Sequence, residues 1–151
     1  MKFPEVEGRN LEGTLFKLPY DLKGKLNLVI IAFKRNQQSL IDEWRFYLSQ
    51  KIQNYEDFHI YELPSLNNSY RFMKFIIDGG MRAGIPDESI RQHTITLYLN
   101  KNSFKKALGI KTEDKIYLLL IDNNGNIIWR ESGGFTSLKF EDFEKNLSQF
   151  Q

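Results

Sequence analysis

The chain has 151 residues, of which 41% are hydrophobic, and its 21 Lys and Arg nearly balance 19 Asp and Glu, giving a net charge of +2. It contains no cysteine, which excludes disulfide bonds, thiol catalysis and thiolate metal sites. The balanced charge predicts no nucleic-acid partner, and no apolar run reaches the roughly 20 residues of a transmembrane helix. We therefore expect a single domain over residues 1–151 with no cofactor and no metal site. Because no signal or transit peptide is visible, we expect a cytoplasmic or organelle-soluble protein.

The first third of the chain predicts two strands and a helix. A short strand is predicted over Gly13–Leu18 and ends at Pro19, and the apolar run Leu26–Phe33 predicts a central strand buried on both faces. Further apolar residues then recur at spacings of three and four, which is typical of one helix face: Leu40, Ile41, Trp44, Tyr47, Leu48 and Ile52.

The middle of the chain continues this alternation. A second strand is predicted over Phe58–Leu63 and is closed by Pro64. A second helix is predicted from Tyr70 to Ile77, where Asp78-Gly79-Gly80 breaks it.

The last third predicts a third strand over residues 93–99, a short helix that Asn102-Ser103 caps and Gly109 ends, and a hairpin. The hairpin joins strands at 116–121 and 126–129 through Asp122-Asn123-Asn124-Gly125. Apolar residues at helical spacing from Phe140 to Phe150 predict a C-terminal helix. The order of elements is β, β-α-β-α-β-α-β-β-α, which predicts an α/β sandwich with a mixed central sheet and an antiparallel strand at its edge.

This order resembles the thioredoxin fold with the extra N-terminal strand and inserted strand and helix of redoxins and peroxiredoxins. Three segments carry the resemblance: Phe3-Pro4 with Leu11-Glu12-Gly13 and residues 22–29, Leu108-Gly109-Ile110, and the hairpin at 119–127. The resemblance implies a three-layer sandwich.

The chain also resembles the thioredoxin-like assembly factors of the mitochondrial ATP synthase. The matching positions are Phe3-Pro4, Leu18-Pro19, Gly24-Lys25, Leu28-Val29, Trp44, Ile60-Tyr61-Glu62, Met81-Arg82, Ile85-Pro86, Tyr117-Leu118, Asp122, Ile128-Trp129 and Ser132-Gly133. In that family the domain is not a thiol enzyme but helps a membrane subunit enter a complex, so the resemblance implies a role in assembly.

The redox positions of the redoxin family are replaced in this chain. Its Cys-x-x-Cys motif aligns with Asn36-Gln37-Gln38-Ser39, and its cis-proline aligns near Lys115-Ile116, where no proline stands. Because both features are missing, we predict a domain without redox activity.

The turn after the central strand is the predicted binding site, since open α/β sheets bind ligands at the carboxyl ends of their strands. Lys34 and Arg35 at a helix start can hold an anion, and the alternative interpretation is a solvated polar turn. His59 and His93 can share a metal or act as a base, although structural roles are the simpler interpretation. The aromatic residues are predicted to pack in the core, and some of them to line a peptide groove.

We therefore predict a non-redox, thioredoxin-like module that binds a protein partner. The predicted binding residues are Lys34, Arg35, Asn36, Gln37, Ser39, Ile116, Tyr117 and Trp129, and no catalytic or metal-binding residue is predicted. The alternatives are a small-molecule or anion binder, or an enzyme, that uses the same end without thiols. A third is a peroxidase-like domain that depends on the cysteines of a partner.

Overall fold

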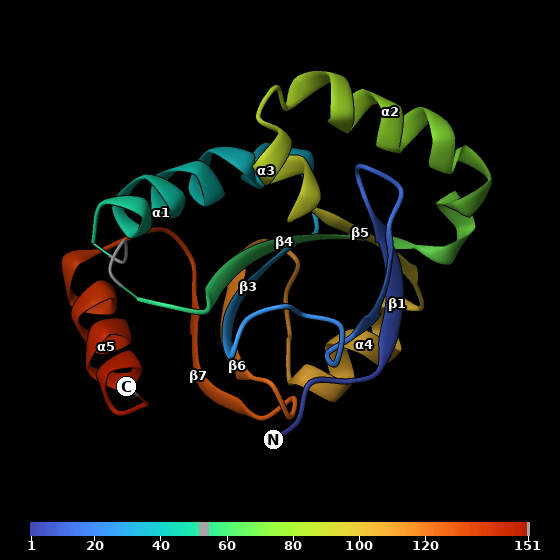
Figure 1. Cartoon of the computed structure of the whole chain (residues 1–151). Helices are drawn as coiled ribbons and strands as arrows, with labels where there is room; N and C mark the ends of the chain where they lie inside the picture. The colour runs from blue at the N-terminus through green and yellow to red at the C-terminus, as the bar shows by residue number, and fades with distance from the viewer. Residues whose placement is uncertain (52–54, 151) are drawn as a thin grey trace.

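The structure is a computed structural model that describes residues 1–51 and 55–150. A seven-stranded sheet runs through it in the order β2-β1-β5-β4-β3-β6-β7 (Figure 1). The strands are β1 (Val6–Asn10), β2 (Leu15–Leu18), β3 (Leu26–Ala32), β4 (Phe58–Asn67), β5 (Ile95–Leu99), β6 (Tyr117–Asp122) and β7 (Ile127–Ser132). The α-helices are α1 (Gln38–Lys51), α2 (Lys74–Gly84), α3 (Glu88–Gln92), α4 (Lys101–Leu108) and α5 (Ser137–Ser148), and two 3-10 turns are η1 (Arg35–Gln37) and η2 (Asn68–Met73).

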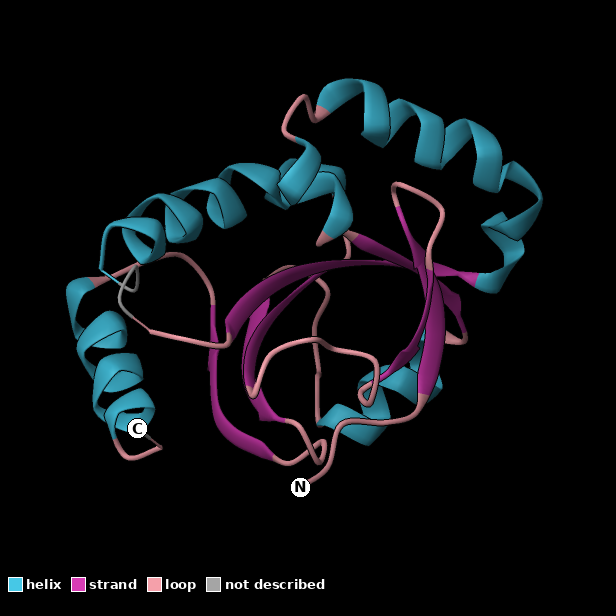
Figure 2. Cartoon of the chain, viewed as in Figure 1, coloured by secondary structure: helices cyan, strands magenta, loops and turns pink. Residues whose placement is uncertain are grey.

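Strand β3 is the centre of the sheet, as its unbroken apolar run predicts. It pairs in parallel with β4 and antiparallel with β6, and all seven of its residues are buried. Val29 and Ile31 pack toward α4, whereas Leu28 and Ile30 pack toward α1 and α5. The helices therefore cover both faces of a mixed sheet, and the predicted three-layer fold is confirmed (Figure 2).

Helix α1 forms where the apolar spacing predicts it. Ile41, Trp44 and Leu48 are its buried residues, and the indole Nε1 of Trp44 donates a hydrogen bond to the main-chain oxygen of Gly133 at 3.0 Å. Tyr47 is partly exposed and stacks on Phe135. The predicted last apolar position, Ile52, lies outside the described residues.

The N-terminal region differs from the prediction of one strand over 13–18, because β1 and β2 form a hairpin around Gly13 and β1 also pairs with β5. The polar segment that forms β1 gives no strand signal, so its pairing with β2 and β5 determines its structure. Gly8 is needed for the pairing with β5, since a Cβ there would lie 2.6 Å from the main-chain oxygen of Thr96.

Pro64 does not end β4, so that prediction is wrong. The strand runs on to Asn67, and only its pairing with β5 is interrupted: Glu62 bridges Thr94, and regular pairing resumes at Ser65. Proline has no N–H to donate to the neighbouring strand, which explains an interruption at this position rather than an end to the strand.

The helix predicted to break at Asp78-Gly79-Gly80 instead continues to Gly84, and α3 follows without having been predicted. At α4, Asn100 rather than Asn102-Ser103 is the cap, because its side chain accepts a hydrogen bond from the Ser103 N–H. The predicted end of α4 at Gly109 is confirmed, with a left-handed φ of 67° that suits glycine.

Candidate functional site

The turn that follows β3 is fixed from inside by Gln37. The Oε1 of this buried side chain accepts hydrogen bonds from the main-chain N–H groups of Phe33 at 2.9 Å and Lys34 at 3.1 Å. Its Nε2 donates to the main-chain oxygen of Glu113 at 2.7 Å. One side chain therefore ties the turn to the loop before β6, so Gln37 supports this end of the sheet rather than facing a partner.

Lys34 forms an ion pair with Asp114 across the same junction. The hydrogen bond and the attraction of the Asp114 carboxylate raise the pKa of Lys34, and the Lys34 ammonium in turn lowers the pKa of Asp114. Because its charge is already matched, Lys34 is a weaker anion ligand than its position in the sequence predicts.

The other polar residues of the turn are free. Arg35, Asn36 and Ser39 are exposed, and their side chains form no hydrogen bond within the described part of the chain. They are the polar side chains that this end of the sheet offers to another molecule.

Ile116 and Tyr117 lie at the same end but belong to the core. Ile116 is fully buried, and Tyr117 packs edge-on against Phe33 and donates a hydrogen bond from its hydroxyl to the main-chain oxygen of Thr112 at 2.7 Å. Both residues are therefore part of the packed core beside the turn and are not exposed to a partner.

Trp129 is not brought to this end. It lies opposite Leu120, which pairs with Leu28 in the middle of β3. Its indole is buried, and Nε1 donates to an oxygen of the Asp142 carboxylate at 2.8 Å. In the structure, Ile116 and Tyr117 therefore lie near the turn after β3, whereas Trp129 lies away from it.

A second set of ion pairs, not predicted from the sequence, lies beside this turn. Glu113 accepts hydrogen bonds from Lys101 at 2.8 Å and Lys105 at 2.6 Å, and these bonds hold the pKa of Glu113 below its usual range. The two lysines lie four residues apart and so share one face of α4. That spacing is the one signal in the sequence; the partner acid becomes apparent only in the folded chain.

A buried carboxylate, Glu62, was also missed. It accepts hydrogen bonds from Gln38 at 3.0 Å and Thr94 at 3.1 Å, and a nitrogen of Arg45 lies 3.5 Å from it. Buried charge of this kind is tolerated only when paired. Glu62 therefore joins α1 to the start of β5.

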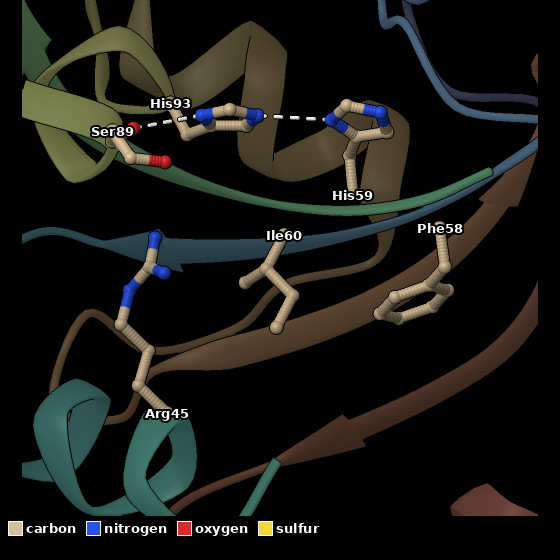
Figure 3. Close-up of a pocket in the computed structure, with 6 residues that line it drawn as sticks. All are labelled: Arg45, Phe58, His59, Ile60, Ser89 and His93. Atoms are coloured by element: carbon tan, nitrogen blue, oxygen red, sulfur yellow. Dashed lines mark hydrogen bonds between the residues drawn. The ribbon is translucent and has the colours of Figure 1, made fainter. Parts of the chain in front are cut away.

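The two histidines meet in an open pocket of about 340 Å³ at the start of β4 (Figure 3). His93 Nδ1 lies 2.8 Å from the carbonyl oxygen of Ser89, which can only accept, so Nδ1 carries a proton and donates it. His93 Nε2, in a neutral ring, must then accept from His59 Nδ1 at 2.9 Å. Burial lowers the pKa of His93, and the nearby charges of His59 and Arg45 add to this.

Nothing in the pocket completes a metal site. Within residues 1–51 and 55–150, no three His, Cys, Asp or Glu side chains come together to hold a metal ion. The histidine pair is thus a hydrogen-bonded unit that ends at Ser89.

Solved structures with thioredoxin-type folds are similar over nearly the whole chain. The exposed lipoprotein thioredoxin Etrx1 of Streptococcus pneumoniae has a TM-score of 0.60 at 12% identity, with 96% of this chain and 99% of that chain covered. The thioredoxin domain of a thiol-disulfide oxidoreductase from Bacteroides vulgatus also has a TM-score of 0.60, at 19% identity and with 99% and 95% covered. StoA from Bacillus subtilis has a TM-score of 0.57 at 13% identity, with 94% and 97% covered. At these identities the likeness shows the fold alone.

The sequence itself decides the family, because the model of the ATP10 protein family matches residues 1–150. The chain belongs to the ATP10 protein family. No curated protein sequence matches it. ATP10 membership confirms the resemblance drawn from Phe3-Pro4 through Ser132-Gly133, and with the cysteine-free thioredoxin-like fold it supports an assembly-type role in coarse terms. No helix in the described part of this ATP10 protein is long and apolar enough to cross a membrane.

Proposed function

We propose that this ATP10 protein is a non-redox assembly module that binds a protein partner at the turn after β3. The main support for this proposal is that Gln37 holds the turn in place through three hydrogen bonds. At the same time the side chains of Arg35, Asn36 and Ser39 remain exposed and without a hydrogen-bond partner in the described part of the chain. A surface whose backbone is already ordered loses little conformational freedom on binding, which favours affinity. The absence of any thiol supports a binding role over disulfide exchange.

The free side chains define the chemistry of the partner surface. The Arg35 guanidinium, the Asn36 amide and the Ser39 hydroxyl together offer mainly hydrogen-bond donors. The matching partner segment presents acceptors, namely carboxylates or main-chain carbonyl groups. The ATP synthase assembly factors that the sequence resembles suggest a subunit of that complex as the partner.

The test is complementation in the host organism after deletion of the gene. Assembled ATP synthase is measured by native electrophoresis in cells that carry the wild-type chain, the double variant Arg35→Glu/Ser39→Glu, or Lys145→Glu. Lys145 is exposed on α5 and is the matched control for charge reversal. We expect the wild type and Lys145→Glu to restore the complex, and the double variant, with an unchanged melting temperature, to fail.

Two results contradict the proposal. If deletion leaves the amount of assembled ATP synthase unchanged, the assembly role is wrong. If the folded double variant restores the complex as well as the wild type does, the turn is not the binding surface.

The two alternative functions, anion or small-molecule binding and partner-dependent peroxide chemistry, are tested separately. Anion or small-molecule binding at the turn predicts a rise in melting temperature with phosphate, sulfate or nucleotides, because a ligand that binds only the folded state stabilises it. The pairing of Lys34 with Asp114 argues against this alternative. Peroxide chemistry through a partner's cysteines predicts peroxide consumption only when that partner is present.

A further inference from the structure

Helix α2 and the turn before it carry large apolar side chains on the outside of the protein. Phe72, Phe75 and Ile76 are 84%, 89% and 73% exposed. Phe72 lies in η2, three and four residues before Phe75 and Ile76 in α2, and this spacing places the three side chains on one side of the helical segment. Figure 2 shows α2 as the outermost helix on its side of the sheet. Single exposed apolar residues are ordinary, whereas a contiguous group of this size marks an interaction site.

The same face continues into residues without bulk. One and two turns further on it presents Gly79, Gly80 and Ala83, all exposed. Neither glycine has a positive φ, and a Cβ at either position would meet nothing within 4 Å. Glycine weakens a helix interior relative to alanine, and nothing in the described chain requires it here. We name this face, Phe72, Phe75, Ile76, Gly79, Gly80 and Ala83, the α2 stripe.

Charge also differs between the two halves of the α2 stripe. Arg71 and Lys74 accompany its bulky half. Arg82 lies beside the bare half, but Glu12 pairs with it at 3.2 Å. The exposed acids Asp87 and Glu88 follow after Ile85-Pro86. Because Glu12 matches the charge of Arg82, the unmatched charge is positive at the bulky end and negative at the bare end.

We propose that the α2 stripe binds the α2 stripe of a second copy of this chain, with the two helices antiparallel about a two-fold axis. This arrangement places the bulky half of each copy on the bare half of the other and brings Arg71 toward Glu88 of its mate. Such an interface is self-complementary, as two-fold symmetry requires. The three large apolar side chains expose roughly 400–500 Å² per copy. Twice that area lies below the range of stable specific interfaces, which fits a weak, reversible dimer.

Sedimentation velocity of the intact chain from about 1 to 200 µM measures the dimer directly. We expect the average mass to rise toward twice the monomer mass with concentration. Phe75→Glu is expected to weaken the dimer by at least about tenfold through the loss of buried apolar contact and the burial of a charge. The matched control is Leu138→Glu, which changes a side chain on α5 that is 78% exposed and leaves dimerisation unchanged.

Three further single variants and one double variant distinguish the two-fold arrangement from nonspecific apolar association. Gly80→Gln fills the bare half with a good helix former, so it weakens the dimer about tenfold while the melting temperature of the dilute chain holds or rises. Arg71→Glu and Glu88→Lys each weaken the dimer, and the double variant restores it because the exchanged charges meet again across the axis.

Three outcomes overturn the proposal. The first is a monomer at every concentration, and the second is a dimer that none of the α2 variants affects. The third is a monomer that binds vesicles of phosphatidylcholine and phosphatidylglycerol and loses this binding in Phe75→Glu. That last result assigns the α2 stripe to a lipid surface instead.

Discussion

The carboxyl ends of β3 and β4 lie at the same edge of the sheet, yet the chain that leaves each strand behaves in opposite ways. After β3, the turn satisfies its main chain through Gln37 and pairs Lys34 with Asp114. After β4, η2 and α2 leave Phe72, Phe75 and Ile76 in solvent. The first segment has an ordered main chain and exposes only polar side chains, whereas the second exposes large apolar side chains. The following variants test this difference, from the largest expected effect to the smallest.

Gln37→Ala tests how firmly the turn after β3 is fixed. It leaves the N–H groups of Phe33 and Lys34 and the carbonyl of Glu113 without this partner. We expect the free energy of unfolding to fall by about 2–3 kcal/mol, since groups left unsatisfied by a buried side chain are costly. Urea denaturation measures the change. Asn36→Ala, at an exposed neighbour, is expected to stay within about 0.5 kcal/mol of the wild type. Equal effects of the two variants would show that the turn is not fixed through Gln37.

Gly79→Ala and Gly80→Ala test whether α2 is open on its outer face. Each is expected to raise the free energy of unfolding by about 0.5–1 kcal/mol, because alanine favours the helix and its Cβ enters open space. Thermal denaturation of the dilute chain measures this. Gly8→Ala is the opposite control, since its Cβ would clash with the main chain of Thr96 and lower stability. A loss of stability at Gly79 or Gly80 would mean that another part of the chain covers the helix.

Glu113 gives the turn after β3 a pH dependence. Because Lys101 and Lys105 lower its pKa in the folded state, the unfolded chain binds more protons as the pH falls. The stability that Glu113 contributes is therefore fully present above its unfolded pKa of about 4.3 and is lost as the pH falls through the lower folded value. Glu113→Gln is expected to be less stable at pH 7 and to lose less on acidification, as measured by urea denaturation from about pH 7 to 3. Glu141→Gln, on the exposed face of α5, serves as the comparison, and identical acid profiles for both variants would refute the role of Glu113.

Lys34→Gln is expected to have the smallest effect, because both partners of this ion pair are exposed and screened by water. Stability should barely change. The pKa of Asp114 should rise toward its ordinary value, because Lys34 is the group that lowers it. An NMR titration of the Asp114 carboxyl carbon measures this directly. A pKa that does not move would mean that the pair does not form in solution.

The sequence correctly predicts those elements whose own pattern of apolar residues shows which faces are buried. The apolar run of β3 and the spacing of Ile41, Trp44 and Leu48 in α1 each state which faces are buried. Strand β1 is set instead by its pairing with β2 and β5, and the continuation of β4 beyond Pro64 is set by its pairing with β5. No local pattern carries that information.

The candidate site divides in the same way. Its place after β3 follows from strand order, which the sequence predicts, and so do the exposed positions Arg35 and Asn36. The inward turn of Gln37 does not follow from strand order, because its partner Glu113 lies 76 residues further along the chain. The pairing of Glu113 with Lys101 and Lys105 depends on how the loop before β6 folds back on α4. The partners of Glu62 likewise come from separate elements and leave no trace in the spacing of residues.

The placement of β1 between β2 and β5 has a consequence for how the chain reaches this fold. Apart from its pairing with β2, the N-terminal segment is held by residues made much later, since Arg9 pairs with Thr96 and the N–H of Phe3 donates to the carbonyl of Gly125. During synthesis, the β1–β2 hairpin must wait for most of the chain to emerge before its open side is paired. Contacts between residues so far apart in the sequence slow folding, because the chain loses conformational entropy before the strand pairing stabilises it. Until β5 has emerged, the N-terminal hairpin therefore keeps an exposed strand edge that is open to chaperones and to other chains.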